Sequence, residues 1–531
     1  MASRVLVSDT LSEAGLSILK NAPGIEVVYK PGLKEAELAA AIPGFDALVI
    51  RSGSKVTAKV IEAAKGLKVI GRAGIGVDNV DVSAASHHGI VVMNTPTGNA
   101  VTTAEHALAL LFSLARRTPQ ATASMKAAKW EKNKFQGREL AGKTLAVIGL
   151  GNIGRIVADR ARGLRMNVIA FDPVVAPERA TSLGVELVPL EQIWPRADAI
   201  TVHTPLTSET RGLVNDDTIA KMKKGVLLVN CARGGIYDEA ALMRGLESGK
   251  IGGVALDVFV EEPPGKIALL DRDDVICTPH LGASTEEAQE RVALEIAEQV
   301  VQYLTTGTIT NAVNVPSVAR EIAPRLNPYV NLARRLGSFL AQVQKVTPRA
   351  IEVECSGEPA ELGTAPITSS AVAGVLERFL EASVNQVSAP HLAKDRGINL
   401  RELKTSPRPG GPSALVSVRI EDAGGGTAHA EGTLAADGSA RLTRWGDYEL
   451  DAHLVGATLV ILNEDRPGVI GAVGTVLGRA EINVARLQVG LNPGSKRAAS
   501  LWSLDSPLPS AVLDEIRRLP NVSTALSVLL P

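Results

Sequence analysis

A glycine-rich turn, Gly149–Gly154, and the acidic residue that follows it constrain the fold of this chain more than any other feature. The turn follows the apolar run 144–148, which predicts a buried parallel strand. It opens the segment 155–165, whose apolar residues recur at helical spacing, and a second apolar run, 167–171, ends at Asp172. Strand, glycine turn, helix, strand and carboxylate in this order are typical of a dinucleotide-binding unit.

The residues of the turn indicate how a dinucleotide would be held. Gly149 permits the tight turn, Gly151 lets backbone N–H groups approach a pyrophosphate, and Gly154 lets the helix pack against the strand. Asn152 and Ile153 begin the helix, whose N-terminus favours phosphate charge. A glycine turn without a ligand is the alternative, but here every flanking element is present.

Asp172 indicates which dinucleotide is bound. We expect its carboxylate to accept hydrogen bonds from the adenosine ribose and to repel a 2′-phosphate. Pro173 supplies no cation that would bind such a phosphate. The sequence therefore predicts NAD rather than NADP as the cofactor.

Composition sets the wider limits. A chain of 531 residues is long enough for about three or four domains. Its 56 Lys and Arg balance 57 Asp and Glu, so we expect neither a nucleic-acid nor a membrane partner. The cysteines, Cys231, Cys277 and Cys355, lie far apart, which predicts no metal site and a reduced, cytoplasmic protein. We expect no signal peptide and no membrane span.

Strand-like and helical stretches alternate through the first half of the chain. This alternation predicts an α/β architecture with two doubly wound parallel sheets, a flavodoxin-like substrate domain at 1–98 and a Rossmann NAD-binding domain at 99–282. A long predicted helix, 285–304, can return the chain to the first domain, so we expect residues 283–317 to complete it. An α+β module is predicted at 318–453.

Three polar residues, Arg233, Glu262 and His280, come soon after predicted strands of the nucleotide-binding sheet. The carboxyl edge of such a sheet is where ligands bind. A guanidinium beside two glycines can bind a carboxylate through two parallel bonds, and an imidazole can accept a hydroxyl proton as hydride leaves the same carbon. Singly, each residue is more often a surface charge or a loop histidine. Together they predict a catalytic site, with His203 as the competing imidazole.

Several motifs then occur in the order seen in NAD-dependent D-2-hydroxyacid dehydrogenases. They are Gly149–Gly154, Asn230–Gly235, Leu256–Phe259, Glu261–Pro263 and Thr278–His280. Within that family, further segments are similar to the D-3-phosphoglycerate dehydrogenase branch: 71–80, 94–96, 120–125 and 280–288. The resemblance covers residues 1 to about 310. It implies oxidation of 3-phospho-D-glycerate to 3-phosphohydroxypyruvate, the first step of L-serine biosynthesis.

The resemblance also implies a role for each site residue. Arg233 would anchor the substrate carboxylate, His280 would be the general acid/base, and Glu262 would orient it. Asp257 and the neighbourhood of Cys231 and Ala232 would contact the nicotinamide half of NAD. The wider cofactor set adds Thr204 near the adenosine, together with Arg233, His280, Gly282 and Ala283.

Recognition of the phosphate separates this substrate from simpler hydroxyacids. Arg51 and Arg72 follow neighbouring predicted strands, and two cations suit a dianionic phosphate. The expected substrate set is Arg51, Ser52, Gly53, Arg72, Gly74, Arg233 and His280. Lys132, Lys134 and Arg138 would add positive charge from the hinge side, or else form a solvated basic face.

The segment 454–531 shows a βαββαβ pattern and resembles the ACT domain, a small ferredoxin-like module that binds amino acids. Asp465 would accept from the effector's ammonium, and Asn483 would donate to its carboxylate; the alternative is that Asp465 caps a helix. The resemblance implies L-serine as the feedback effector and a homodimer or homotetramer. Position 463 is Asn, where some long relatives carry an aromatic residue. Residues 318–453 resemble the intervening domain of the long form of this family.

Two other functions remain open at this point. A hydroxypyruvate or glyoxylate reductase shares the scaffold, although Arg51, Arg72 and the ACT-like segment argue against it. An NAD-binding transcriptional corepressor also shares it, and would use NAD as a sensed ligand. Turnover of a phosphorylated substrate separates these alternatives.

Overall fold

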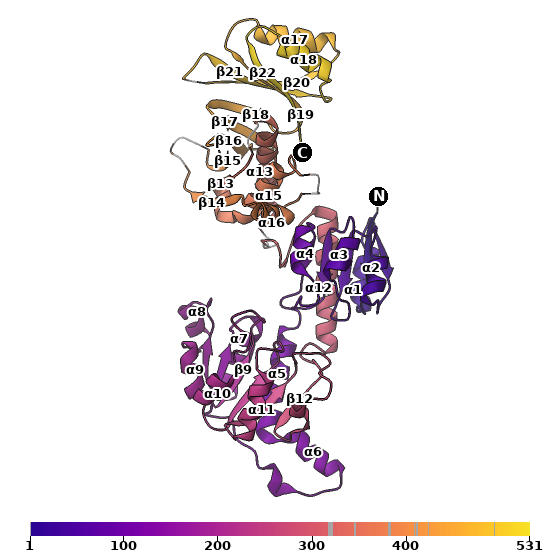
Figure 1. Ribbon diagram of the computed structural model, residues 1–531, viewed down its shortest axis with the longest axis vertical. Coiled ribbons are helices and arrows are strands. Elements are labelled where there is room, and N and C mark those ends of the chain that lie inside the picture. Colours follow the sequence, from indigo (N-terminus) through magenta and orange to yellow (C-terminus); the bar gives the residue numbers. More distant parts are fainter. Residues whose placement is uncertain are drawn as a thin grey trace.

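The chain forms four successive β-sheets in a computed structural model (Figure 1). The structure describes residues 2–316, 322–344, 347–380, 384–407, 409, 412–422, 424–492 and 494–531. The boundary predicted near residue 317 therefore lies outside the described residues. Within the described ranges, no helix combines the length and apolarity needed to cross a bilayer.

The first sheet is parallel, with strand order β2-β1-β3-β4-β5. Its strands are β1 (Ser3–Val7), β2 (Ile25–Tyr29), β3 (Ala47–Ile50), β4 (Val69–Arg72) and β5 (Val91–Met93), and helices α1 (Glu13–Asn21), α2 (Glu35–Ala41), α3 (Ala58–Ala63) and α4 (Val82–His87) connect them. Strand β3, at the centre of the sheet, is buried along its whole length, as its continuous apolar sequence requires.

Helix α12 (Glu286–Thr306) returns to this first sheet, as the sequence predicts. It buries Val292, Ile296 and Val300 in the same core as Val5 and Val69 of the sheet. The segment that follows the nucleotide-binding sheet therefore packs against the N-terminal part of the chain.

The second sheet is also parallel, with strand order β12-β11-β10-β9-β6-β7-β8. Its strands are β6 (Thr144–Ile148), β7 (Asn167–Phe171), β8 (Glu186–Leu187), β9 (Ala199–Val202), β10 (Val226–Asn230), β11 (Ile251–Leu256) and β12 (Val275–Cys277). The associated helices are α5 (Ala100–Arg116), α6 (Thr118–Lys126), η1 (Lys132–Phe135), α7 (Asn152–Gly163), α8 (Pro177–Ser182), α9 (Leu190–Arg196), α10 (Asp216–Lys221), α11 (Glu239–Glu247) and η2 (Ala268–Asp271).

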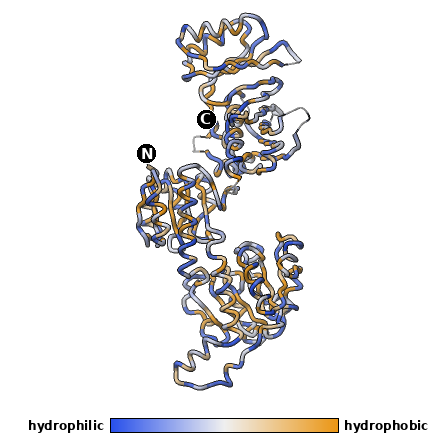
Figure 2. Tube along the Cα trace, turned by 180° about the vertical axis from the view of Figure 1, so that it is seen from behind, coloured by the Kyte–Doolittle hydropathy of each residue, from blue (hydrophilic) through white to orange (hydrophobic). Residues whose placement is uncertain are grey.

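The strand order reverses at β6, which pairs with β7 on one side and β9 on the other. Connections on the two sides leave in opposite directions, so a crevice opens at the carboxyl ends of these strands. The prediction of two doubly wound parallel sheets is confirmed. In Figure 2 hydrophobic stretches run along these strands.

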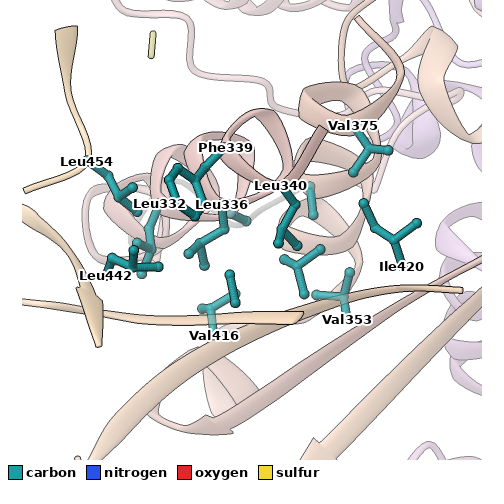
Figure 3. Close-up of a cluster of buried hydrophobic side chains, with 14 of the residues drawn as sticks. Leu332, Leu336, Phe339, Leu340, Val353, Val375, Val416, Ile420, Leu442 and Leu454 are labelled. Atoms are coloured by element: carbon teal, nitrogen blue, oxygen red, sulfur yellow. The ribbon is translucent and has the colours of Figure 1, made fainter. Parts of the chain in front are cut away.

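The third sheet is mixed, with order β14-β13-β15-β16-β17-β18, and is covered by α13 (Ala323–Val343). Figure 3 shows Leu336, Phe339 and Leu340 of this helix in a cluster with Val353 and Val416 of the sheet. The strands are β13 (Ala350–Gly357), β14 (Asn399–Thr405), β15 (Ala414–Glu421), β16 (Thr427–Leu434), β17 (Ala440–Trp445) and β18 (Tyr448–His453); the other helices are α14 (Glu358–Leu362), α15 (Ala365–Leu376) and α16 (Ser388–Asp395).

The C-terminal sheet is antiparallel, with order β20-β21-β19-β22. Its elements are β19 (Gly456–Glu464), α17 (Val469–Arg479), β20 (Val484–Leu491), β21 (Arg497–Leu504), α18 (Ser510–Arg517) and β22 (Val522–Leu530), in the predicted βαββαβ order. Gln342 at the end of α13 accepts from the Leu529 N–H and donates to its carbonyl. The last sheet is thus tied to the third one.

Candidate active site

A cleft of about 710 Å³ is lined by strand ends of the first and second sheets. Most residues that the sequence predicts for substrate and cofactor line it: Arg51, Ser52, Arg72, Gly74, Asn152, Ile153, Thr204, Cys231, Ala232, Arg233, Asp257, Glu262, His280, Gly282 and Ala283. Residues of the first sheet and residues of the second sheet therefore line the same cleft.

His280 and Glu262 form a hydrogen-bonded pair at one wall of this cleft. The Nδ1 atom of His280 lies 2.8 Å from Oε2 of Glu262, and Oε1 of that carboxylate accepts from the Phe259 N–H at 3.2 Å. Because a carboxylate only accepts, Nδ1 carries the proton and Nε2 is the basic nitrogen. Within the described chain no partner of Nε2 is found, so this nitrogen is available to a ligand.

The backbone around His280 is held by Asp257, which follows β11. His280 has a φ of 55°, in the left-handed region. Its N–H donates to the Asp257 carbonyl at 2.9 Å. The Asp257 carboxylate accepts from the N–H groups of Leu281 and Gly282 at 2.7 and 2.8 Å. This residue therefore brackets the loop that carries the imidazole.

The side chain of Asp257 is saturated by protein groups. It is fully buried and also accepts from Thr278 at 2.6 Å and lies 3.2 Å from Nε2 of His106. Burial raises the pKa of Asp257, but hydrogen bonds from His106, Thr278 and Leu281 outweigh burial and lower it overall. Asp257 lines the cofactor side of the cleft as a structural carboxylate with its oxygens already engaged.

Arg233 reaches across the cleft from the second sheet toward the first. Its Nε donates to Oδ2 of Asp78 at 2.7 Å, and its Nη1 donates to the Ala232 carbonyl at 2.7 Å. A Cβ at Gly76 would overlap Nη2 of the same guanidinium, so this glycine makes room for Arg233. Asp78 was not predicted as a site residue, although it lies within the motif 71–80.

Arg72, the last residue of β4, is a half-buried cation of the cleft. Burial, reinforced by the neighbouring Arg233, lowers the pKa of Arg72 to about 10. Its Nε is buried without a hydrogen-bond partner among the described residues. A Cβ at Gly74 would overlap this guanidinium, which explains the glycine. A buried, incompletely satisfied cation is suited to an anionic ligand.

Arg51 lies beside Arg72 on a loop that Asp9 shapes. The Asp9 carboxylate accepts from the N–H groups of Arg51 and Ser54 at 2.6 and 3.0 Å. A Cβ at Gly53 would lie 2.5 Å from the same carboxylate, so only glycine fits without a shift. Sequence reasoning missed Asp9; its position directly after the first strand run was the available signal.

The glycine turn fits a dinucleotide as the sequence predicts it should. Gly149 has a φ of 93°, and a Cβ there would lie 2.6 Å from the His203 carbonyl. At Gly151 nothing lies within 4 Å, and this residue is the N-cap of α7 without a side-chain cap. The uncapped amides of α7 are thus open to phosphate oxygens. A Cβ at Gly154 would overlap the Gly149 carbonyl.

Other predicted cofactor residues have protein partners of their own. Asp172 accepts from the N–H groups of Leu150 and Val174 at 2.8 and 2.9 Å, which places its carboxylate beside the turn. Asn152 donates its side-chain amide to the Pro96 carbonyl at 3.0 Å. Thr204 has a buried hydroxyl without a partner among the described residues, so a ligand group would satisfy it.

His203 and Cys231 are buried groups in their neutral forms. Burial lowers the pKa of His203 to about 4, and its Nε2 lies 3.0 Å from the Thr201 hydroxyl. Burial also raises the pKa of the Cys231 thiol. His203 is therefore a neutral imidazole near the cofactor turn, and His280 is the histidine with an available basic nitrogen.

The basic residues near 132–138 lie elsewhere. Lys134 pairs with Glu131, and Arg138 donates to the carbonyl of Gly225, which precedes β10. Gly225 is at the amino edge of the second sheet, opposite the edge that carries Arg233. Lys132, Lys134 and Arg138 do not line the cleft. Among the described residues, no group of three or more His, Cys, Asp or Glu is placed to hold a metal ion.

Replacement of Gly154 by alanine is expected to weaken NAD binding by at least about tenfold. The added methyl group overlaps the Gly149 carbonyl, so the turn must shift away from the phosphate-binding conformation. Calorimetric titration of NAD measures the effect. Gly163→Ala, on the same helix with nothing within 4 Å, is the matched control and should bind NAD normally. Equal affinities for the two variants would contradict this account of the turn.

Comparison with known proteins agrees with this geometry. The D-isomer specific 2-hydroxyacid dehydrogenase NAD binding domain matches residues 108–282, and the D-3-phosphoglycerate dehydrogenase intervening domain matches 325–445. The structure of TT0316 protein from Thermus thermophilus is similar at a TM-score of 0.54 and 36% identity, over 58% of this chain and 99% of that one. D-Lactate dehydrogenase from Aquifex aeolicus, complexed with NAD and lactic acid, has a TM-score of 0.53 and 27% identity, over 59% and 100% of the two chains.

Relatives with known names span nearly the whole chain. D-3-phosphoglycerate dehydrogenase of Synechocystis is 42% identical over 99% of this chain and 95% of its own length. The enzyme of the same name from Bacillus subtilis is 40% identical over 99% of this chain and all of its own. The chain therefore belongs to the D-3-phosphoglycerate dehydrogenases, NAD-dependent members of the D-2-hydroxyacid dehydrogenase family.

Proposed function

We propose that this chain oxidises 3-phospho-D-glycerate to 3-phosphohydroxypyruvate with NAD, the first step of L-serine biosynthesis. The observation that carries the proposal is one cleft containing a His280–Glu262 pair, two arginines for a phosphate and a third for a carboxylate. A simpler hydroxyacid would need only one of these arginines. The relatives named above support the same substrate.

Substrate binding follows from the positions of the guanidinium groups. Arg233 binds the carboxylate, which replaces Asp78 as its anionic partner. Arg72 and Arg51 bind the phosphate, and the partial burial of Arg72 strengthens this interaction by excluding water. The two ends of the substrate are then fixed, and C2 with its hydroxyl group lies between them.

Proton transfer falls to His280. The Nε2 atom accepts the C2 hydroxyl proton while Glu262, bonded to Nδ1–H, stabilises the imidazolium that forms. When bound, NAD supplies the acceptor for the hydride that leaves C2. The products are the 2-oxo acid, NADH and one proton, which His280 releases to solvent. In the reductive direction the imidazolium donates that proton to the carbonyl oxygen.

We also propose a role for each of the four domains. Residues 1–98 with 283–317 bind substrate, 99–282 bind NAD, 318–453 form the intervening domain, and 454–531 form an ACT domain that binds L-serine. The N-cap of α17 is Gly468, so Asp465 is not the cap of that helix. Asp465 and Asn483 are exposed, and the α17 amides have no side-chain cap. This arrangement supports an effector site that a second copy completes, in a homodimer or homotetramer.

A reducing, cytoplasmic location is also proposed. All three cysteines are free thiols, two of them buried. Unpaired cysteines persist where the compartment keeps thiols reduced.

Replacement of His280 by alanine is expected to lower kcat for hydroxyacid oxidation by about a hundredfold or more, because the proton acceptor is lost. NAD affinity should change by less than about threefold, since the glycine turn is untouched. Steady-state kinetics and calorimetry measure the two quantities. His88→Ala, at the exposed C-cap histidine of α4, is the control. An unchanged kcat in the His280 variant would show that another group accepts the proton.

A preference for phosphorylated substrate is expected from the arginine pair. NADH consumption with 3-phosphohydroxypyruvate should far exceed that with hydroxypyruvate. Arg72→Leu should lower kcat/KM for the phosphorylated acid by about ten- to a hundredfold and leave hydroxypyruvate little changed, because only the phosphate contact is removed. Lys65→Leu, at an exposed cation of the same region, should retain the preference. If the wild type prefers hydroxypyruvate, the phosphate assignment is wrong.

L-Serine is expected to inhibit the reductive reaction of the intact protein. Asp465→Ala should raise the half-inhibitory concentration by about tenfold, because the partner of the effector's ammonium is lost. Asp514→Ala removes an exposed carboxylate on α18 and should leave inhibition unchanged. Titration of initial rates with serine measures this. Absence of inhibition in the wild type would refute the effector assignment while leaving the catalytic one intact.

A further inference from the structure

His106 on α5 has no role in the mechanism described above, yet it contacts the group that holds the catalytic loop. Its Nε2 lies 3.2 Å from Oδ1 of Asp257 and 3.0 Å from Oγ1 of Thr278. Its side chain is 19% exposed, and that of Asp257 is 1% exposed. Helix α5 carries the chain from the first sheet to the second, so His106 belongs to the connection between them.

The hydrogen-bond network fixes the protonation of this nitrogen. The Thr278 hydroxyl donates its single proton to Oδ1 of Asp257 at 2.6 Å, so its oxygen faces His106 as an acceptor. The Asp257 carboxylate is likewise an acceptor. With two acceptors in reach, Nε2 of His106 must carry a proton and donate to both. His106 is therefore a hydrogen-bond donor in this network.

The carboxylate at the centre passes this interaction on to His280. Asp257 accepts from the N–H groups of Leu281 and Gly282, directly after the catalytic histidine. His280 itself has a φ of 55°, a conformation that a non-glycine residue adopts only when its surroundings hold it. Removal of one donor leaves a buried carboxylate undersatisfied, and the carboxylate then shifts toward its other donors.

We propose that His106 is a positioning residue for the proton transfer at His280: it holds the Asp257 carboxylate, and through it the loop 278–282 and the His280 imidazole. The proposal rests on the function proposed above for the same site. A residue that only filled space would be replaced without loss by an apolar side chain of similar size. A donor to a buried carboxylate would not.

The test compares His106→Leu, which keeps the volume and removes the donor, with His106→Gln, which restores an amide donor. We expect the leucine variant to lose about ten- to a hundredfold in kcat, with KM for 3-phosphohydroxypyruvate and the NAD dissociation constant within about threefold of wild type. The glutamine variant should recover most of kcat. His88→Leu, the same change at an exposed histidine, should match wild type.

A double-mutant cycle with Asp257→Asn decides whether His106 acts through Asp257. If it does, His106→Leu costs little further in the Asp257→Asn background, so the two losses are not additive. Full additivity, an unchanged kcat in the leucine variant, or a loss that glutamine does not restore would each overturn the proposal. Should the leucine variant not fold, His106→Asn, whose shorter amide falls short of Asp257, replaces it in the cycle.

Measurement of the wild-type rates with different 2-oxo acids tests the proposed function separately from the role of His106. If the wild type reduces a different 2-oxo acid better than 3-phosphohydroxypyruvate, the substrate assignment fails. The cycle is then run on the preferred acid, because the loop and its imidazole serve any 2-hydroxyacid substrate. The outcome for His106 is therefore independent of the identity of the substrate.

Discussion

A single buried carboxylate, Asp257, determines where the reactive histidine lies. It stands at the carboxyl end of β11 and engages every N–H group from His280 to Gly282, one through its carbonyl and two through its side chain. A charge without solvent is stable only if donors surround it, so the buried carboxylate favours the arrangement in which these N–H groups point toward it. The rest of the site depends on this constraint, because the imidazole contacts Glu262 on one side and, in the proposed function, the substrate on the other. The donors that lower the pKa of Asp257 are the same groups that order the loop.

The cleft contains a cluster of three arginines and two nearby aspartates. Arg72, Arg51 and Arg233 repel one another, and this repulsion adds to burial in lowering the pKa of Arg72. Asp78 offsets part of the positive charge through its ion pair with Arg233. Asp9 offsets another part, since its carboxylate lies beside Arg51 and accepts from the N–H group of that residue. An anionic substrate completes the neutralisation, so the free cleft is arranged for two negative groups at a fixed separation. In the proposed function, this arrangement would give the site a preference for a phosphorylated hydroxyacid that one arginine alone would not provide.

The C-terminal half forms a continuous body with its own core. Helix α13 packs its apolar face on the third sheet (Figure 3). Residues of the fourth sheet, Val460 and Val528 among them, belong to the same cluster. Gln342 binds both backbone groups of Leu529, so the last sheet is hydrogen-bonded directly to the end of α13. The third region in turn touches the first through His87 and Asp395 and through Asn385 and Gly89. These contacts link the fourth sheet to the third region, and the third region to the first sheet.

The sequence by itself determined the two parallel sheets, the dinucleotide turn and the residue types of the site. These depend on local properties: apolar periodicity, glycine conformations, and the rule that parallel strands present their carboxyl ends on one edge. Helices α13 and α15 of the third region were not predicted from the sequence. Every residue of α15 from Ile367 to Leu376 is buried, so its apolar residues mark no single helical face. Only the tertiary structure decided which groups pair. Asp257 binds the loop that carries His280, Arg233 pairs with Asp78, and His106 contacts a carboxylate 151 residues away in the sequence. Such contacts depend on how helices and sheets pack, and the spacing of two residues in the sequence does not indicate whether they are close in space.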